Sequence, residues 1–191
     1  NSTDLAIISI GMTLVIVSGG MDVSAGTVLG VVAILIGRGI QSAWPAPVIV
    51  AGALALGAAI GTINGLIVTY GNISDMIATL GTMNIWRAVI FALLGGRWIT
   101  GLPPVFSGLV MGKTAGIPNP VFLITAAYLV FHYITTYRPF GRAIYCVGNN
   151  REAAKLAGIN VRLVKICTYS IMGALTGLAA LFYIGRMGGV D

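Results

Sequence analysis

Residues 39–74 read GIQSAWPAPVIVAGALALGAAIGTINGLIVTYGNIS and contain no charged residue. Over the 191 residues, 57% are hydrophobic and only 8% are charged, whereas a soluble domain typically carries about 25% charged residues. A membrane-spanning helix needs roughly 20 mostly apolar residues, and this stretch is long enough to supply one. The composition therefore predicts an all-α polytopic membrane protein and excludes an ordinary soluble domain.

Six apolar segments follow one another along the chain. They are Leu5–Ser18, Val23–Gly37, Pro47–Tyr70, Met76–Gly96, Val121–Tyr137 and Val164–Gly185. The first two are short for a full crossing and are joined by SGGMDVSAG at 18–26. Non-helical backbone at membrane depth persists only where protein or water surrounds it, so we expect two spans that meet at a broken, half-buried turn.

Small residues recur at four-residue spacing on the faces of these segments. They are Ala53, Gly57, Gly61 and Gly65 in the third segment, Gly26 and Gly30 in the second, and Gly173, Gly177 and Gly185 in the last. Such faces let helix backbones approach closely. We expect a tightly packed bundle, a property that receptors, channels and transporters share and that identifies none of them.

Basic residues concentrate in the range 138–165, which holds six of the eleven Lys and Arg residues. Because cytoplasmic loops carry the excess of Lys and Arg, we place this range in the cytoplasm. Alternating crossings then put Gly71–Asp75 and Gly19–Val23 inside, and Arg97–Pro120 and the loop around Trp44 outside. Aromatic residues fit this orientation, with Trp44 and Trp98 at the outer interface and Tyr70 and Tyr137 at the inner one.

Polar side chains within or beside the apolar segments are the candidates for a translocation path. They are Asp22, Asn64, Thr79, Thr82, Asn84 and Arg87. Ionisable groups at membrane depth are usually functional, but the sequence leaves structural alternatives open. Asp22 is also suited to cap the following helix, Arg87 to snorkel outward, and Asn64 to join two helices by a hydrogen bond.

The segment NREAAKLAG, residues 150–158, has the pattern of a short helix. Asn150 is suited to cap its start, and Gly158 suits the left-handed residue that closes a helix. Glu152 in the first turn and Lys155 near the end complement the helix dipole. A helix of about 10 Å is too short to be stable alone, so we expect it to dock in a groove through Ala153, Ala154, Leu156 and Ala157.

Several other signals are negative. SGLVMGKT at 107–114 has three residues between its glycines, whereas a phosphate-binding loop has four and follows a strand, so we expect no ATP hydrolysis by this chain. Cys146 and Cys167 form no ligand pattern with the single histidine, His132, which we expect to be a packed interior polar group. The bases flank apolar spans, which argues against a nucleic-acid partner.

Three blocks of the sequence resemble the ribose/xylose/galactose-type (carbohydrate uptake 2) permeases of ABC importers. GMTLVIVSGGMDVSAGTVLG (11–30) is similar to that family's GGIDLSVGS region, NGLIVTYGNISDMIATLGTMNIWRA (64–88) to its second block, and FGRAIYCVGNNREAAKLAGINVRLVK (140–165) to its third. Within the third block, EAAKLAG (152–158) resembles the EAA loop of ABC-importer permeases. The blocks occur in family order and cover most of the chain.

The resemblance implies a type II-like permease bundle of roughly ten helices, of which residues 1–191 would be an internal portion: a single, partial permease domain with a coupling loop at 138–165. It implies a multi-pass subunit, surrounded by lipid, of the bacterial cytoplasmic (inner) membrane. The implied partners are a cytosolic ABC ATPase, an extracytoplasmic solute-binding protein and a second permease subunit. The chain would be no enzyme and hold no cofactor, because the ATPase binds ATP.

In this family the EAA-type loop forms the coupling helix that sits in a cleft of the ATPase. Carried onto this chain, the coupling residues are Arg151, Glu152, Ala153, Ala154 and Gly158. The solute would be a sugar or sugar-like molecule, and GGRWITGLP at 95–103 leans toward the autoinducer-2 type. The alternative function is an ion- or proton-coupled secondary transporter, which would need coupling groups at membrane depth such as Asp22, Arg87 and His132.

Overall fold

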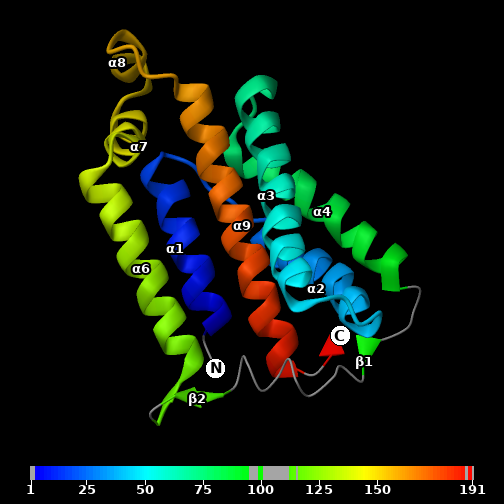
Figure 1. Ribbon diagram of the computed structural model, residues 1–191. Coiled ribbons are helices and arrows are strands. Elements are labelled where there is room, and N and C mark those ends of the chain that lie inside the picture. Colours follow the sequence, from blue (N-terminus) through cyan, green and yellow to red (C-terminus); the bar gives the residue numbers. More distant parts are fainter. Residues whose placement is uncertain (1–2, 95–98, 101–111, 115, 188, 191) are drawn as a thin grey trace.

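The computed structural model describes residues 3–94, 99–100, 112–114, 116–187 and 189–190. Its helices are α1 (Thr3–Val17), α2 (Ala25–Gln41), α3 (Ala46–Gly71), α4 (Asp75–Leu94), α6 (Asn119–Tyr137), α7 (Pro139–Asn149), α8 (Arg151–Leu156) and α9 (Val161–Met187). Four two-residue strands, β1 (Ile99–Thr100), β2 (Lys113–Thr114), β3 (Ile117–Pro118) and β4 (Gly189–Val190), pair antiparallel as β1 with β4 and β2 with β3. The helices form a bundle (Figure 1).

Each of the six predicted apolar segments corresponds to a helix of the described residues, which confirms the all-α polytopic class. In the part of the chain that the structure describes, four helices, α3, α4, α6 and α9, are long and apolar enough to cross a membrane. The shorter α1 and α2 are joined by the non-helical residues 18–24, so the predicted break between two short helices is present. The helix α7 was not predicted; it follows α6 directly and buries Gly141, Ile144 and Val147.

The core of the bundle is the crossing of α3 with α9, which lie side by side in Figure 1. A Cβ on Gly57 would overlap the carbonyl oxygen of Gly173, and a Cβ on Gly61 would overlap that of Tyr169. Only glycine permits this approach, because the overlapping atoms belong to backbone that no change of rotamer can move. The small face predicted on the third segment is therefore a helix–helix contact, whereas Gly26 of α2 has no atom within 4 Å of its Cβ position.

The remaining helices surround this pair unequally. Alongside it, α2 buries a continuous apolar run that includes Val31, Val32 and Ile34 and packs on α3 and α9. By contrast α4 buries only Ala78, Thr79 and Thr82, and α6 buries only Pro120. Most of the surface of α4 and α6 is therefore open in this chain.

The two ends of the bundle differ. α8 lies at one end, and the short strands lie at the other (Figure 1). Arg151 of α8 contacts both the break after α1, at Gly19, and the start of α4, at Asp75, so the three segments predicted to be cytoplasmic share one end. Trp98, most of the predicted outer loop and the phosphate-loop-like stretch at 107–111 lie outside the described residues.

Candidate functional site

α8 is capped at both ends, as predicted. The side-chain oxygen of Asn150 accepts hydrogen bonds from the backbone N–H groups of Glu152 and Ala153, each at 3.0 Å. Gly158 has a φ of 80°, in the left-handed region that favours glycine at a helix end. Lys155 Nζ lies 2.7 Å from Glu152 Oε1. Local signals in the sequence therefore determine both the position and the length of this helix.

α8 docks onto the bundle through a single buried residue. Ala154 packs with Ile144 and Val147 of α7 and with Val164 of α9. The other α8 residues are exposed, and Leu156 is 90% exposed. Ala154, expected at the ATPase, thus anchors the helix to the permease itself. Leu156, expected with the alanines to fit a groove, is left uncovered in this chain.

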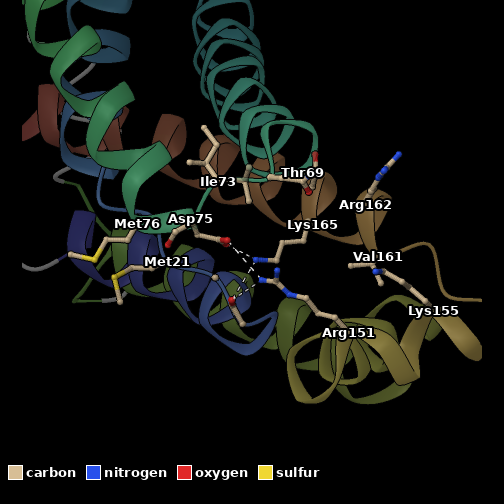
Figure 2. Close-up of a pocket in the computed structure, with 15 residues that line it drawn as sticks. Met21, Thr69, Ile73, Asp75, Met76, Arg151, Lys155, Val161, Arg162 and Lys165 are labelled. Atoms are coloured by element: carbon tan, nitrogen blue, oxygen red, sulfur yellow. Dashed lines mark hydrogen bonds and ion pairs between the residues drawn. The ribbon is translucent and has the colours of Figure 1, made fainter.

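Arg151, also expected at the ATPase, points into the protein. Its Nη2 atom lies 3.3 Å from the carbonyl oxygen of Gly19 and 3.8 Å from Asp75 Oδ1. Asp75 is the first residue of α4. Figure 2 shows the Arg151 and Lys165 side chains converging on this position from α8 and α9.

The Asp75 carboxylate is the centre of an ion cluster, defined here as Asp75, Arg151, Lys165 and Tyr169. Asp75 Oδ2 accepts from Lys165 Nζ and lies 2.8 Å from the Tyr169 hydroxyl. That hydroxyl is also 3.0 Å from the carbonyl oxygen of Met21. Lys165 and Tyr169 are buried, so α9 fixes the start of α4 and the α1–α2 break around one carboxylate.

A pocket of about 670 Å³ opens beside this ion cluster. Its walls come from the α1–α2 break, the α3–α4 turn, α8 and the start of α9. Four bases line it, but each has a partner: Arg151 and Lys165 face Asp75, Lys155 pairs with Glu152, and Arg162 lies over the Tyr70 ring at 5.2 Å. In Figure 2 the Arg162 guanidinium points away from Asp75. The pocket therefore lies beside an ion cluster whose charges already pair with one another.

The α1–α2 break also carries a buried polar group. Asp22 Oδ1 accepts from the backbone N–H of Ser24 at 2.8 Å and from its hydroxyl at 2.6 Å. Asn64 Nδ2 of α3 donates to the same Ser24 hydroxyl at 2.8 Å. Burial raises the pKa of the Asp22 carboxyl, and the hydrogen bonds from Ser24 and Asn64 oppose the rise. Asp22 therefore does not cap the amides of α2, as the structural alternative expected, but holds Ser24, the residue before that helix. Asn64 joins α3 to the α1–α2 break rather than to a second helix.

The polar residues of α4 divide between two faces. Thr79 and Thr82 are buried, and Thr79 Oγ1 accepts from the backbone N–H of Val23 in the break, at 3.2 Å. Asn84 and Arg87 are exposed on the open side of α4. The structure therefore brings Thr79 to the break and leaves Asn84 and Arg87 apart from it.

Metal-ligating side chains do not gather in the ranges that the structure describes, which hold no group of three or more His, Cys, Asp or Glu. His132, expected to pack in the interior, is exposed on α6. Its ring stacks on Tyr128 with the centroids 6.2 Å apart. The face of α6 that carries it is open in this chain, which is why an apolar sequence context did not bury it.

Comparison with known proteins matches the whole chain to one family. The model of the family described as "Branched-chain amino acid transport system / permease component" matches residues 1–191. The chain is 37% identical over 186 residues to the ribose import permease protein RbsC of Escherichia coli (strain K12). It is 34% identical to the protein of the same name from Haemophilus influenzae (strain ATCC 51907 / DSM 11121 / KW20 / Rd).

A second group of relatives carries a different name. The chain is 29% identical over 184 residues to the autoinducer 2 import system permease protein LsrC of Escherichia coli (strain K12 / DH10B). These alignments cover 95% and 96% of this chain but only 58% and 54% of the ribose and autoinducer 2 relatives. The chain thus spans little more than half the length of the curated relatives it matches. No solved structure matches it.

Proposed function

The chain belongs to the permease-component family of branched-chain amino acid transport systems, and from this membership we propose that it forms part of the transmembrane subunit of an ATP-driven importer. A separate cytosolic ATPase, an extracytoplasmic solute-binding protein and a second permease subunit complete this importer in the bacterial cytoplasmic membrane. The chain is a permease component with apolar helices suited to cross a membrane. Energy reaches it through α8.

One observation carries the proposal: α8 is a short capped helix of which only one residue is buried. It is capped, attached to the bundle through Ala154, and otherwise exposed, with Leu156 90% exposed at its end. A helix of six residues is too short to be stable alone, and this one is held to the bundle at one residue, so its exposed face is available to a partner. Arg151 faces the ion cluster behind the helix, so a force on α8 has a contact through which to act.

The solute that we propose is a sugar or sugar-like molecule. Ribose import is in the name of one group of relatives and autoinducer 2 import in that of the other, and identity is higher with the first group. The stretch 95–103, which leaned toward autoinducer 2, lies largely outside the described residues. We propose that Asp22, Asn64, Thr79 and Thr82 shape the inner part of the translocation path and that Asn84 and Arg87 line its open side along α4.

The test of coupling uses the full-length permease that contains this segment, reconstituted with its ATPase and binding protein. Leu156→Asp should abolish co-purification of the ATPase, and Glu152→Lys and Gly158→Val should lower solute-stimulated ATP hydrolysis. Gly158→Val acts through the left-handed backbone, where a residue with a Cβ costs roughly 1–2 kcal/mol. Arg142→Gln on α7, an exposed base outside the ion cluster, is the matched control.

A second measurement separates this proposal from a secondary transporter. Vesicles supplied with ATP should accumulate the solute in the presence of an ionophore that collapses ion and proton gradients. Accumulation that requires a gradient and ignores ATP would reject the importer. Normal co-purification and stimulation in all three α8 variants would reject α8 as the coupling helix. Binding-protein affinity for a panel of pentoses, hexoses, rhamnose and autoinducer 2 identifies the solute.

A further inference from the structure

The Asp75 carboxylate joins pieces of chain that are far apart in sequence. Lys165 and Tyr169 come from α9, and Arg151 comes from α8. Two carbonyl oxygens of the α1–α2 break, those of Gly19 and Met21, are held by the same bases and hydroxyl. One carboxylate therefore sets the relative position of the start of α4, the break, α8 and α9.

The contacts of Asp75 are of two kinds. The Lys165 side chain is 2% exposed. Separating a buried pair leaves a buried charge without a partner, so we expect the Lys165–Asp75 pair to remain intact when α8 moves. The Arg151 side chain is 51% exposed and its 3.8 Å contact is long, which places it among the exposed ion pairs that contribute little to stability. Arg151 is thus the contact that can be broken and remade while Lys165 keeps the charge of Asp75 balanced.

α4 is lightly packed against the rest of the bundle, so a change in the Arg151 contact is able to alter its tilt or rotation about the Asp75–Lys165 pair. α4 buries only Ala78, Thr79 and Thr82, so few side chains resist a small rotation or shift of the helix. Thr79 is one turn after Asp75 and bonds to Val23 in the break. A displacement of Asp75 therefore acts on α4 and on the break leading to Asp22 at the same time.

We propose that Arg151 is a positioning residue that transmits movement of α8 to the inner end of α4. Arg151 acts on the Asp75 carboxylate, while Lys165 keeps that carboxylate paired to α9. The proposal rests on the proposed function, and it assigns Arg151 to the permease side of α8 rather than to the ATPase. Displacement of α8 withdraws the guanidinium from Asp75 and from the Gly19 carbonyl, and the start of α4 and the break then rearrange together.

The experiment measures two distances in the full-length complex in nanodiscs, before and after ATP addition. Spin labels are attached to cysteines that replace exposed residues in a background with Cys146→Ser and Cys167→Ser. Labels at Ala157 and Leu163 report α8 relative to α9, and labels at Met76 and Leu163 report α4 relative to α9. In the complex with unchanged Arg151, both distances should change with ATP.

In Arg151→Gln the α8 distance should still change, whereas the α4 distance should not. Solute-stimulated ATP hydrolysis should fall roughly 5-fold to 150-fold, the usual range of a coupling free energy. Arg151→Lys, which keeps the charge, should restore part of the α4 distance change and part of the stimulated ATP hydrolysis. If Arg151 had a merely structural role, the α4 distance would still change with ATP in Arg151→Gln. Arg142→Gln should behave like the unchanged complex.

Three results would overturn the proposal: a normal α4 response in Arg151→Gln, normal stimulation in that variant, or loss of ATPase co-purification, which would make Arg151 an ATPase contact. Failure of the proposed function looks different, because then neither distance responds to ATP even with Arg151 in place.

Discussion

The Asp4 carboxylate of α1 and the Arg186 guanidinium of α9 form a two-point ion pair, with Oδ1 to Nη1 at 3.3 Å and Oδ2 to Nη2 at 3.1 Å. It lies at the opposite end of α9 from Lys165, about 30 Å away along the helix axis. α9 therefore carries an ion pair near each end, one to α4 and one to α1.

Asp4→Asn should destabilise the protein by about 1–3 kcal/mol. This figure lies between those for exposed and buried pairs, because the two side chains are only 14% and 26% exposed. The measurement is the midpoint of denaturation in detergent. Glu152→Gln, which breaks the exposed pair with Lys155, is the control and should leave the midpoint nearly unchanged. Equal effects of the two substitutions would contradict the prediction.

Gly57→Ala should destabilise the α3–α9 crossing by about 1–3 kcal/mol, the usual cost of overpacking. The added Cβ meets the Gly173 carbonyl oxygen, so the helices must separate. Gly26→Ala, with no atom near the new Cβ, should leave the protein at least as stable. Unfolding midpoints of the two variants compare the sites directly. A Gly57→Ala protein as stable as Gly26→Ala would mean that the helices do not cross as described.

Ser24→Ala should cost about 1–3 kcal/mol, because it leaves both the Asp22 carboxylate and the Asn64 amide with one buried hydrogen bond fewer. The control is Ser9→Ala, which removes an exposed hydroxyl that bonds only within α1, to the Leu5 carbonyl oxygen. The readout is the same denaturation midpoint. A smaller loss in Ser24→Ala than in Ser9→Ala would show that the Ser24 hydroxyl does not hold the break to α3.

Cys146 should react with a membrane-impermeant thiol reagent only after the membrane is opened. The thiol is exposed on α7, the helix directly before α8, and the charge distribution places this part of the chain in the cytoplasm. Cells that carry the full-length permease are labelled before and after permeabilisation, with Cys146→Ser as the control for labelling of Cys167. Labelling of Cys146 from outside intact cells would reverse the orientation.

The bundle was predictable because its signals are local. Apolar length predicts the spans, four-residue spacing predicts the faces of Gly57 and Gly61, and Asn150 with Gly158 delimits α8. The helix α7 was missed because Arg142 within it and Arg138 just before it were explained as a topology signal, although its buried residues Gly141, Ile144 and Val147 share one face.

The ion cluster was not predictable in the same way. Asp75 and Lys165 are 90 residues apart, and a sequence pattern does not pair two charges that only tertiary packing brings together at the starts of α4 and α9. The direction of Arg151 likewise depends on how α8 docks, and its docking is set by the burial of Ala154. Local pattern thus determined that α8 forms, but tertiary packing determined which of its residues face inward.

The glycine crossing of α3 and α9 restricts how this protein changes shape. Helices that contact through interlocking side chains are able to slide over one another by small rotamer changes, the shear type of motion. Between Gly57 and Gly173 the contact is backbone on backbone, so we expect the two helices to move together as one rigid body. On the proposed function, other helices would then move about this pair, and we expect the distance between α3 and α9 to stay constant while the distances to other helices change, which makes it an internal reference.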